Sequence, residues 1–148
     1  MSLLKQLQDD VKDALRARDS ARTQNLRMLV AALQKSAKEK LRDLESAEEI
    51  QVLNRERKQR VEAAEAFEKG GADDRAALER EQAALIEHYL PAQMDAEELA
   101  RLVDAAVEET GATSPKEMGA VMKALMPRVA GRADGKLVSA AVQQRLSS

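Results

Sequence analysis

The stretch KEMGAVMKALMPRVAGRADGKLVSAAV, from Lys116 to Val142, gives the clearest indication of the fold. Ser114 is a good N-cap just before it, Pro115 suits a first helical position, and Glu117 completes a capping box. Pro127 lacks a backbone N–H and disfavours helix at the preceding residue, so we expect this helix to end near it. The stretch predicts two short helices joined by a constrained turn.

The turn carries its own conformational signals. Gly131 allows a positive φ at little cost, and Asp134 can cap a last helix that runs to about Leu146. Gly119 is the one glycine inside a predicted helix, where it costs about 1 kcal/mol relative to alanine. We interpret Gly119 as a position where another backbone approaches closely, with contact to RNA as the alternative.

Positive charge concentrates in this region. Between Lys116 and Ser148 there are six basic and two acidic residues, although the net charge of the whole chain is -2. Attraction to a polyanion must therefore be local, because the overall charge provides none. The candidate phosphate-binding residues are Lys123, Arg128, Arg132 and Lys136.

The composition favours a core built from aliphatic side chains. Of 148 residues, 44% are hydrophobic but only 1% are aromatic, represented by Phe67 and Tyr89. Such a core suits closely packed helices and is unusual for a sheet. Together with the periodicity of the apolar residues, this composition predicts an all-α protein.

Upstream of the tail, the helical periodicity predicts an antiparallel four-helix array over residues 1–90. Capping boxes are expected at Ser46/Glu49 and, after the array, at Asp95/Glu98. Gly70-Gly71 and Gly111 mark helix ends. We place a domain boundary at Pro91, so that residues 91–148 form a three-helix tail domain. The expected helices of the array span about 3–18, 20–44, 46–69 and 73–90.

No autonomous catalytic centre is recognisable. His88 is the only histidine, the chain has no cysteine, and no phosphate-binding glycine loop is present. The acidic pairs are explained by helix first turns and solvated faces. We therefore predict no catalytic residues, no cofactor and no metal site.

Several motifs together resemble the GatB/YqeY family. They are Gly119-x-x-Met122-Lys123, Gly131-Arg132-Ala133-Asp134, RKQR at Arg57–Arg60 and EHYLPAQM at Glu87–Met94. The tail looks like that of the B subunit of the glutamine-dependent aminoacyl-tRNA amidotransferases, and the whole chain looks like the stand-alone YqeY-like proteins. The chain departs from the B subunit in lacking its catalytic cradle, and in having Gly135 where that tail often has proline.

The resemblance implies a tRNA-binding accessory module, in which Gly119 and Gly131 permit close approach of the RNA and whose partner is a tRNA-dependent amidotransferase or an aminoacyl-tRNA synthetase. The lack of cysteine and of any apolar run long enough to span a membrane predicts a cytoplasmic protein. Two alternatives stay open. One is a protein-interaction module that uses the Met118/Met122/Met126 stripe or the long N-terminal helices. The other, implied by the family's name, is an amidotransferase-like carbon–nitrogen ligase with glutamine as amido donor, acting only with partner subunits. No membrane association is expected.

For the basic cluster Arg55, Arg57, Lys58 and Arg60, we expect a solvated face of ion pairs.

Overall fold

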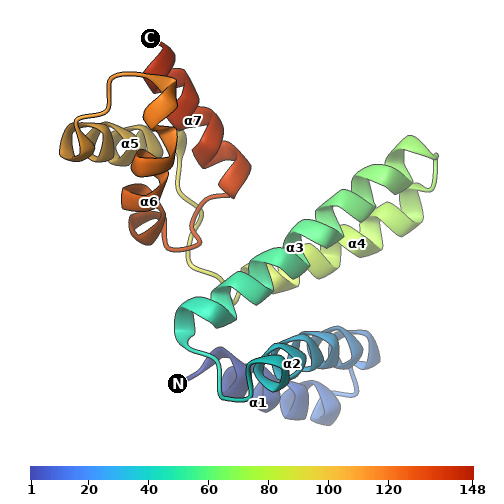
Figure 1. Cartoon of the computed structure of the whole chain (residues 1–148). Helices are drawn as coiled ribbons and strands as arrows, with labels where there is room; N and C mark the ends of the chain where they lie inside the picture. The colour runs from blue at the N-terminus through green and yellow to red at the C-terminus, as the bar shows by residue number, and fades with distance from the viewer. The chain divides into compact units, whose positions relative to one another are not determined.

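A computed structural model describes residues 1–148, which form α-helices, one 3-10 turn and no β-strand (Figure 1). The predicted all-α class is therefore confirmed. The chain folds into two compact units, Met1–Leu90 and Pro91–Ser148. Each unit has its own hydrophobic core.

The first unit consists of two antiparallel hairpins. Helices α1 (Leu3–Arg16) and α2 (Ser20–Lys40) form one, and α3 (Ser46–Lys69) and α4 (Asp73–Glu87) form the other. Short connections force each pair to pack side by side, and α3 also contacts both α1 and α2. The core joins the hairpins through Leu7, Ala14, Leu26, Leu29, Leu33, Val52, Leu53, Ile86 and Leu90.

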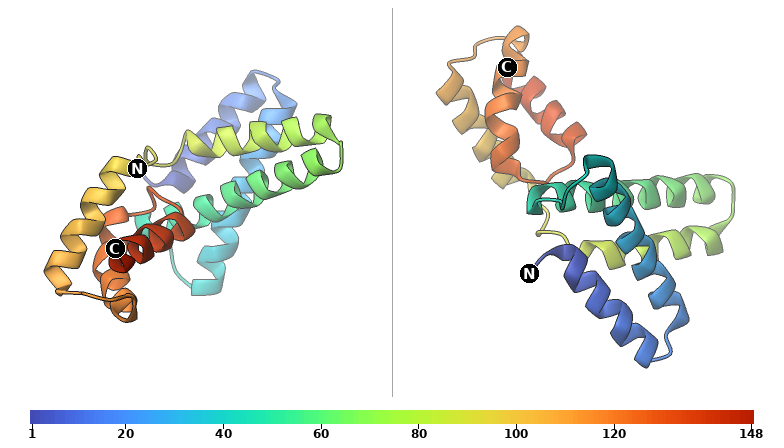
Figure 2. Two further views of the ribbon diagram at one scale, coloured as in Figure 1. Left: turned by 90° about the horizontal axis from the view of Figure 1, so that it is seen from above. Right: turned by 60° about the horizontal axis from the view of Figure 1, so that its bottom comes forward.

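Helices α3 and α4 pack against each other and lie side by side in both views of Figure 2. Ala64 is fully buried and Ala76 is 2% exposed, so small side chains let the two helices approach closely. Arg80 bridges them through Glu68 at 2.8 Å. The hairpin ends at Gly70-Gly71 as predicted, with Gly71 at a φ of 78°.

The predicted capping box Ser46/Glu49 is wrong by one residue. Glu45 is the N-cap, and its backbone N–H donates to Glu48 Oε1 at 2.9 Å. Glu49 is instead buried, with 3% exposed, and accepts hydrogen bonds from the backbone N–H groups of Leu3 at 3.2 Å and Leu4 at 2.8 Å. The first amides of a helix lack partners within the helix and attract negative charge, so α1 offers Glu49 a buried, non-local partner.

The tail unit contains α5 (Ala96–Thr110), the 3-10 turn η1 (Pro115–Glu117), α6 (Met118–Val129) and α7 (Gly135–Ser147). Gly111 ends α5 in the left-handed conformation, and the predicted box of Ser114 and Glu117 is present. The core is purely aliphatic and consists of Leu99, Val103, Ala106, Val107, Ala112, Val121, Leu125, Val129, Val138, Val142 and Leu146.

The first helix of the quoted stretch ends within two residues of Pro127, as predicted, but Pro127 itself does not terminate it. Helix α6 continues through Pro127 to Val129. Pro127 lies on the exposed face of the last turn. It has no N–H to donate to the carbonyl four residues earlier, but on this face water can hydrogen-bond that carbonyl instead. The reversal comes from Ala130 and Gly131 instead, which have φ values of 49° and 79°.

Candidate nucleic-acid interface

The corner between α6 and α7 is held by backbone hydrogen bonds. The N–H of Ala130 donates to the carbonyl of Met126 at 3.1 Å, and that of Arg132 donates to Val129 at 3.0 Å. Asp134 caps α7 as predicted, accepting from the N–H of Lys136 at 3.2 Å. The turn therefore fixes the positions of the basic residues on α6 relative to those on α7.

Arg132 is bound within the tail. Its guanidinium donates to both carboxylate oxygens of Glu98, at 2.8 and 3.0 Å, and its Nε donates to the carbonyl of Ala92 at 2.9 Å. The carbonyl of Arg132 in turn accepts from the N–H of Met94 at 2.7 Å. Arg132 thus ties the turn to the start of α5 and to the segment that precedes it.

This arrangement corrects the predicted box of Asp95 and Glu98. Asp95 does cap α5, accepting from the N–H of Glu98 at 2.7 Å. The carboxylate of Glu98, however, is taken by Arg132. A bidentate pair between arginine and a carboxylate is stronger than a hydrogen bond to one exposed amide, so the long-range partner prevails.

Arg128 pairs with Glu109 on α5, but this pair lies at the surface. The side chain of Arg128 is 39% exposed and that of Glu109 is 54% exposed. An ion pair this exposed contributes roughly 0–1 kcal/mol, because water and salt compete with it. Arg128 can therefore exchange Glu109 for a phosphate at small cost.

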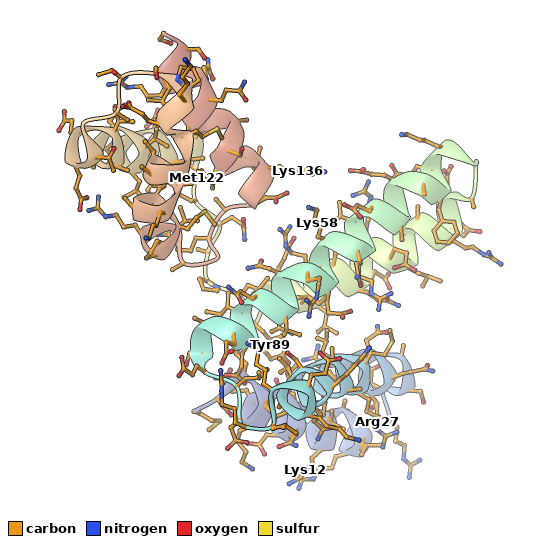
Figure 3. The ribbon with its side chains drawn as sticks, in the orientation of Figure 1. Lys12, Arg27, Lys58, Tyr89, Met122 and Lys136 are labelled. Atoms are coloured by element: carbon orange, nitrogen blue, oxygen red, sulfur yellow. The ribbon has the colours of Figure 1, made fainter.

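Lys123 and Lys136 differ from the two arginines. Both are exposed, on α6 and in the first turn of α7, and neither has a carboxylate within 4.0 Å of its ammonium group. Figure 3 shows Lys136 extending away from the tail helices. Of the four predicted phosphate-binding residues, two are thus unpaired and two are held by glutamates of the same unit.

The two glycines named for close approach behave differently. A Cβ added to Gly119 would meet no heavy atom within 4 Å, so the interpretation that another backbone of the chain lies against it is wrong. The surface around Gly119 is open, and its contact with RNA stays a prediction. Gly131 has a positive φ of 79°, so glycine is favoured there by backbone conformation.

The methionine stripe belongs largely to the core. Met118 and Met122 pack against the buried residues of the tail, whereas Met126 is 39% exposed. Core filling therefore explains two of the three methionines.

The two motifs in the first unit are mainly structural. Arg57 and Arg60 have side chains only 19% and 22% exposed, facing Glu87 at 3.9 Å and Glu79 at 3.7 Å on α4. The expected ion pairing is present, including the pair of Arg60 with Glu56 at 3.8 Å, but the expected solvated face is wrong for these two arginines.

The EHYLPAQM motif links the end of α4 to the core. The hydroxyl of Tyr89 donates to a carboxylate oxygen of Asp10 on α1, and Leu90 is buried. Burial and the Asp10 carboxylate raise the pKa of Tyr89 well above its usual range, so the phenol stays protonated. His88 is exposed at the C-cap of α4 and forms no ion pair.

Sequence reasoning missed two features. One is an apolar groove of about 580 Å³ between α5 and α7, lined by Leu99, Val103, Leu137 and several alanines and bounded at one end by the pair of Asp104 and Arg145 at 2.8 Å. The other is a basic groove between α1 and α2, which contains Lys12 and Arg27. The signal for the second was visible, since α2 carries four bases and no acid from Ser20 to Lys38.

No group of three or more His, Asp or Glu residues is placed to hold a metal ion. No helix combines the length and the apolar character needed to cross a bilayer. The tail presents a helical scaffold with an exposed, unpaired lysine on each side of a fixed turn.

The class is thus an all-helical protein of two units with a basic corner in the second. Comparison with known protein families matches residues 4–146 to the family described as YqeY-like protein. Because the match covers nearly all of the chain, the protein belongs to the YqeY-like family. No curated protein matches the chain.

Proposed function

We propose that this protein is a cytoplasmic accessory module that binds tRNA through its tail unit. The observation that carries the proposal is the pair of exposed, unpaired lysines, Lys123 and Lys136, on the two helices that flank the Gly131 turn. The likeness of this tail to that of the amidotransferase B subunit supports tRNA as the ligand. The contacts are to phosphates, because the tail has no aromatic side chain on which a base could stack.

The four candidate residues contribute unequally under this proposal. Lys123 and Lys136 contact phosphates directly, since binding costs them no ion pair. Arg128 joins them by releasing Glu109, a loss of roughly 0–1 kcal/mol. Arg132 keeps Glu98 and the carbonyl of Ala92, and holds the turn in the shape that presents the others.

The expected affinity favours an accessory role. Three phosphate contacts give a log–log salt slope of about -2 to -3, so a fourfold rise in salt weakens binding roughly 16- to 64-fold. With so few contacts, binding at physiological salt is too weak to sequester tRNA alone. A larger enzyme that handles the same tRNA, either an amidotransferase or an aminoacyl-tRNA synthetase, supplies the remaining contacts.

The test is titration of labelled tRNA at low salt with the full chain. We expect Lys123→Glu/Lys136→Glu to weaken binding at least tenfold. The control is Lys69→Glu/Arg75→Glu, which changes the net charge equally on the α3–α4 hairpin and should retain most of the affinity. Equal losses in the two variants would show that only net charge matters and would refute the tail site.

The apolar groove between α5 and α7 favours a second candidate, a protein-interaction module that accepts an amphipathic helix of a partner. Leu137 on its rim is 63% exposed, although it is a large aliphatic side chain. An exposed leucine beside a row of alanines is the surface into which a helix can place its apolar face. Leu137→Gln, which adds no charge beside Lys136, should abolish partner capture under this candidate and leave tRNA affinity unchanged. Partner capture unaffected by the substitution would eliminate it.

A further inference from the structure

The two hairpins of the first unit carry opposite charge. The segment 3–40, which contains α1 and α2, has nine basic and five acidic residues. The segment 46–87, which contains α3 and α4, has seven basic and eleven acidic residues. A net charge of -2 for the whole chain therefore conceals a clearly positive hairpin packed on a clearly negative one.

The positive hairpin has a groove along the seam between its helices. The groove has a volume of about 420 Å³ and is lined by Lys5, Gln8, Val11, Lys12, Arg27 and Val30. A second depression of about 470 Å³ continues from Arg27 toward the loop between the helices, where Leu15, Arg18, Asp19 and Gln24 line it. The Asp19 carboxylate there caps α2, accepting from the N–H of Arg22 at 3.0 Å. Arg27 belongs to both, so the two depressions adjoin at its side chain.

The cations at the centre of this groove are not neutralised. Lys5 pairs with Asp9 at 2.9 Å, and Arg16 pairs with Asp13 at 3.4 Å. Lys12 and Arg27 are exposed, and neither has a carboxylate oxygen within 4.0 Å. Figure 3 shows both side chains projecting from the hairpin on the side away from α3 and α4. The acidic residues of the unit are concentrated in α3 and α4.

The positive face extends along α2 beyond the groove. Arg27, Lys35 and Lys38 are exposed at spacings of eight and three residues, which places them on one face of the helix. At a rise of 1.5 Å per residue this row is about 16 Å long. Because the row of cations is longer than one phosphate group, it can contact several phosphates of the same chain.

The shape and composition of the groove select one class of ligand. A phosphodiester chain is narrow enough to enter a groove, whereas the flat surface of a bilayer can contact only its rims. Membrane-surface helices also insert a continuous face of large apolar side chains, but the apolar lining of the two depressions consists only of Val11, Val30 and Leu15. Gln8 and Gln24 add hydrogen-bond donors suited to phosphate and sugar oxygens.

We propose that the groove between α1 and α2 binds the phosphodiester backbone of a nucleic acid, with Lys12 and Arg27 as its principal contacts. Binding there reads charge and spacing rather than base sequence, because cations contact phosphates whatever bases they carry. The site lies in a different unit from the tail lysines and uses none of them, so it stands or falls independently of the proposed function.

The test uses the full chain and a labelled 20-nucleotide single-stranded RNA at 50 mM salt, with a DNA of the same sequence as a second arm. Lys12→Glu/Arg27→Glu should weaken RNA binding at least tenfold. Lys12→Gln/Arg27→Gln should reduce the magnitude of the log–log salt slope by about 1.4, which corresponds to two single-strand phosphate contacts. Lys69→Glu/Arg75→Glu is the charge-matched control. Circular dichroism should show unchanged helix content in every variant.

The outcomes separate this site from the tail. Loss in the groove variants with retention in the control supports the groove, whatever Lys123→Glu/Lys136→Glu does. Loss in the tail variant alone overturns the groove and leaves the tail proposal intact. Failure of the wild-type protein to bind RNA or DNA at 50 mM salt also overturns it. Tighter binding to vesicles containing phosphatidylserine than to RNA, with the same dependence on Lys12 and Arg27, would assign the groove to a membrane instead.

Discussion

Glu49 in the first unit and Glu98 in the tail occupy the same place in a predicted capping box, yet each serves a different long-range partner. Glu49 is buried and accepts two backbone N–H groups at the start of α1. Glu98 is one-third exposed and binds the guanidinium of Arg132. Glu49 therefore takes its hydrogen bonds from backbone amides, whereas Glu98 forms an ion pair with an arginine side chain.

This difference determines which positive charges stay available for a ligand. In the tail, Glu98 and Glu109 occupy Arg132 and Arg128, so the lysines carry the binding potential. In the first unit, Glu49 makes no use of a cation, and Lys12 and Arg27 stay unpaired on the opposite hairpin. An ion pair inside a unit thus supports the fold, and an unpaired cation on its surface is available for recognition.

The largest effect on stability is expected from Glu49→Ala. The substitution leaves the amides of Leu3 and Leu4 without acceptors in a partly buried position and should lower the free energy of unfolding of the first unit by about 3 kcal/mol. Hydrogen exchange of the α1 amides, compared with an exposed control, Glu62→Ala, measures the loss. A difference below about 0.5 kcal/mol would show that water replaces the carboxylate and that the two glutamates are equivalent surface groups.

Arg132→Ala should have the next largest effect, about 2 kcal/mol, because Glu98 and the carbonyl of Ala92 lose their donors. The loss should appear in hydrogen exchange of residues 91–148 and leave the first unit unchanged. Lys136→Ala, four residues away and unpaired, is the control and should cost less than about 0.5 kcal/mol. Similar costs for the two substitutions would contradict the structural role of Arg132.

The smallest effect concerns Glu48, which closes the local capping box of α3. Hydrogen bonds from Arg42, then from Lys40 and the N–H of Glu45, hold its pKa well below the usual range of a carboxylate. A depressed pKa in the folded state means that the stabilisation is complete above the unfolded pKa, near 4.5, and is lost as the pH falls from there toward the folded pKa. The Tm difference between wild type and Glu48→Gln should therefore shrink from pH 7 to pH 3. A difference that grows in acid would contradict this sign.

Much of the fold was predictable because local signals act within a few residues. Apolar periodicity and the aliphatic composition indicated helices throughout, and glycine marked the ends at Gly71 and Gly111. The partners of Glu49 and Glu98 lie 46 and 34 residues away, beyond the reach of any local pattern. The local pattern also did not predict that α6 continues through Pro127. A helix tolerates a proline where the carbonyl that loses its N–H partner is exposed to water, and the sequence does not show that exposure.

The candidate site was predictable as a region but not residue by residue. Counting charges identified the basic tail, yet the sequence does not show that Arg128 and Arg132 face glutamates of α5 while Lys123 and Lys136 do not. The α1–α2 groove was missed because the acids of the other hairpin mask its charge in the total. Counting charges helix by helix shows the basic segment, but only the structure brings Lys12 of α1 and Arg27 of α2 together in one groove.

The central claim, that unpaired cations recognise nucleic acid while paired ones hold the fold, is tested most directly by the salt dependence of tRNA binding. We predict that Lys123→Gln/Lys136→Gln reduces the magnitude of the slope by about 1.4 to 1.8 without changing Tm, whereas Arg132→Gln lowers Tm and changes the slope by less than about 0.5. A reduced slope in Arg132→Gln together with an unchanged slope in the lysine variant would contradict the account.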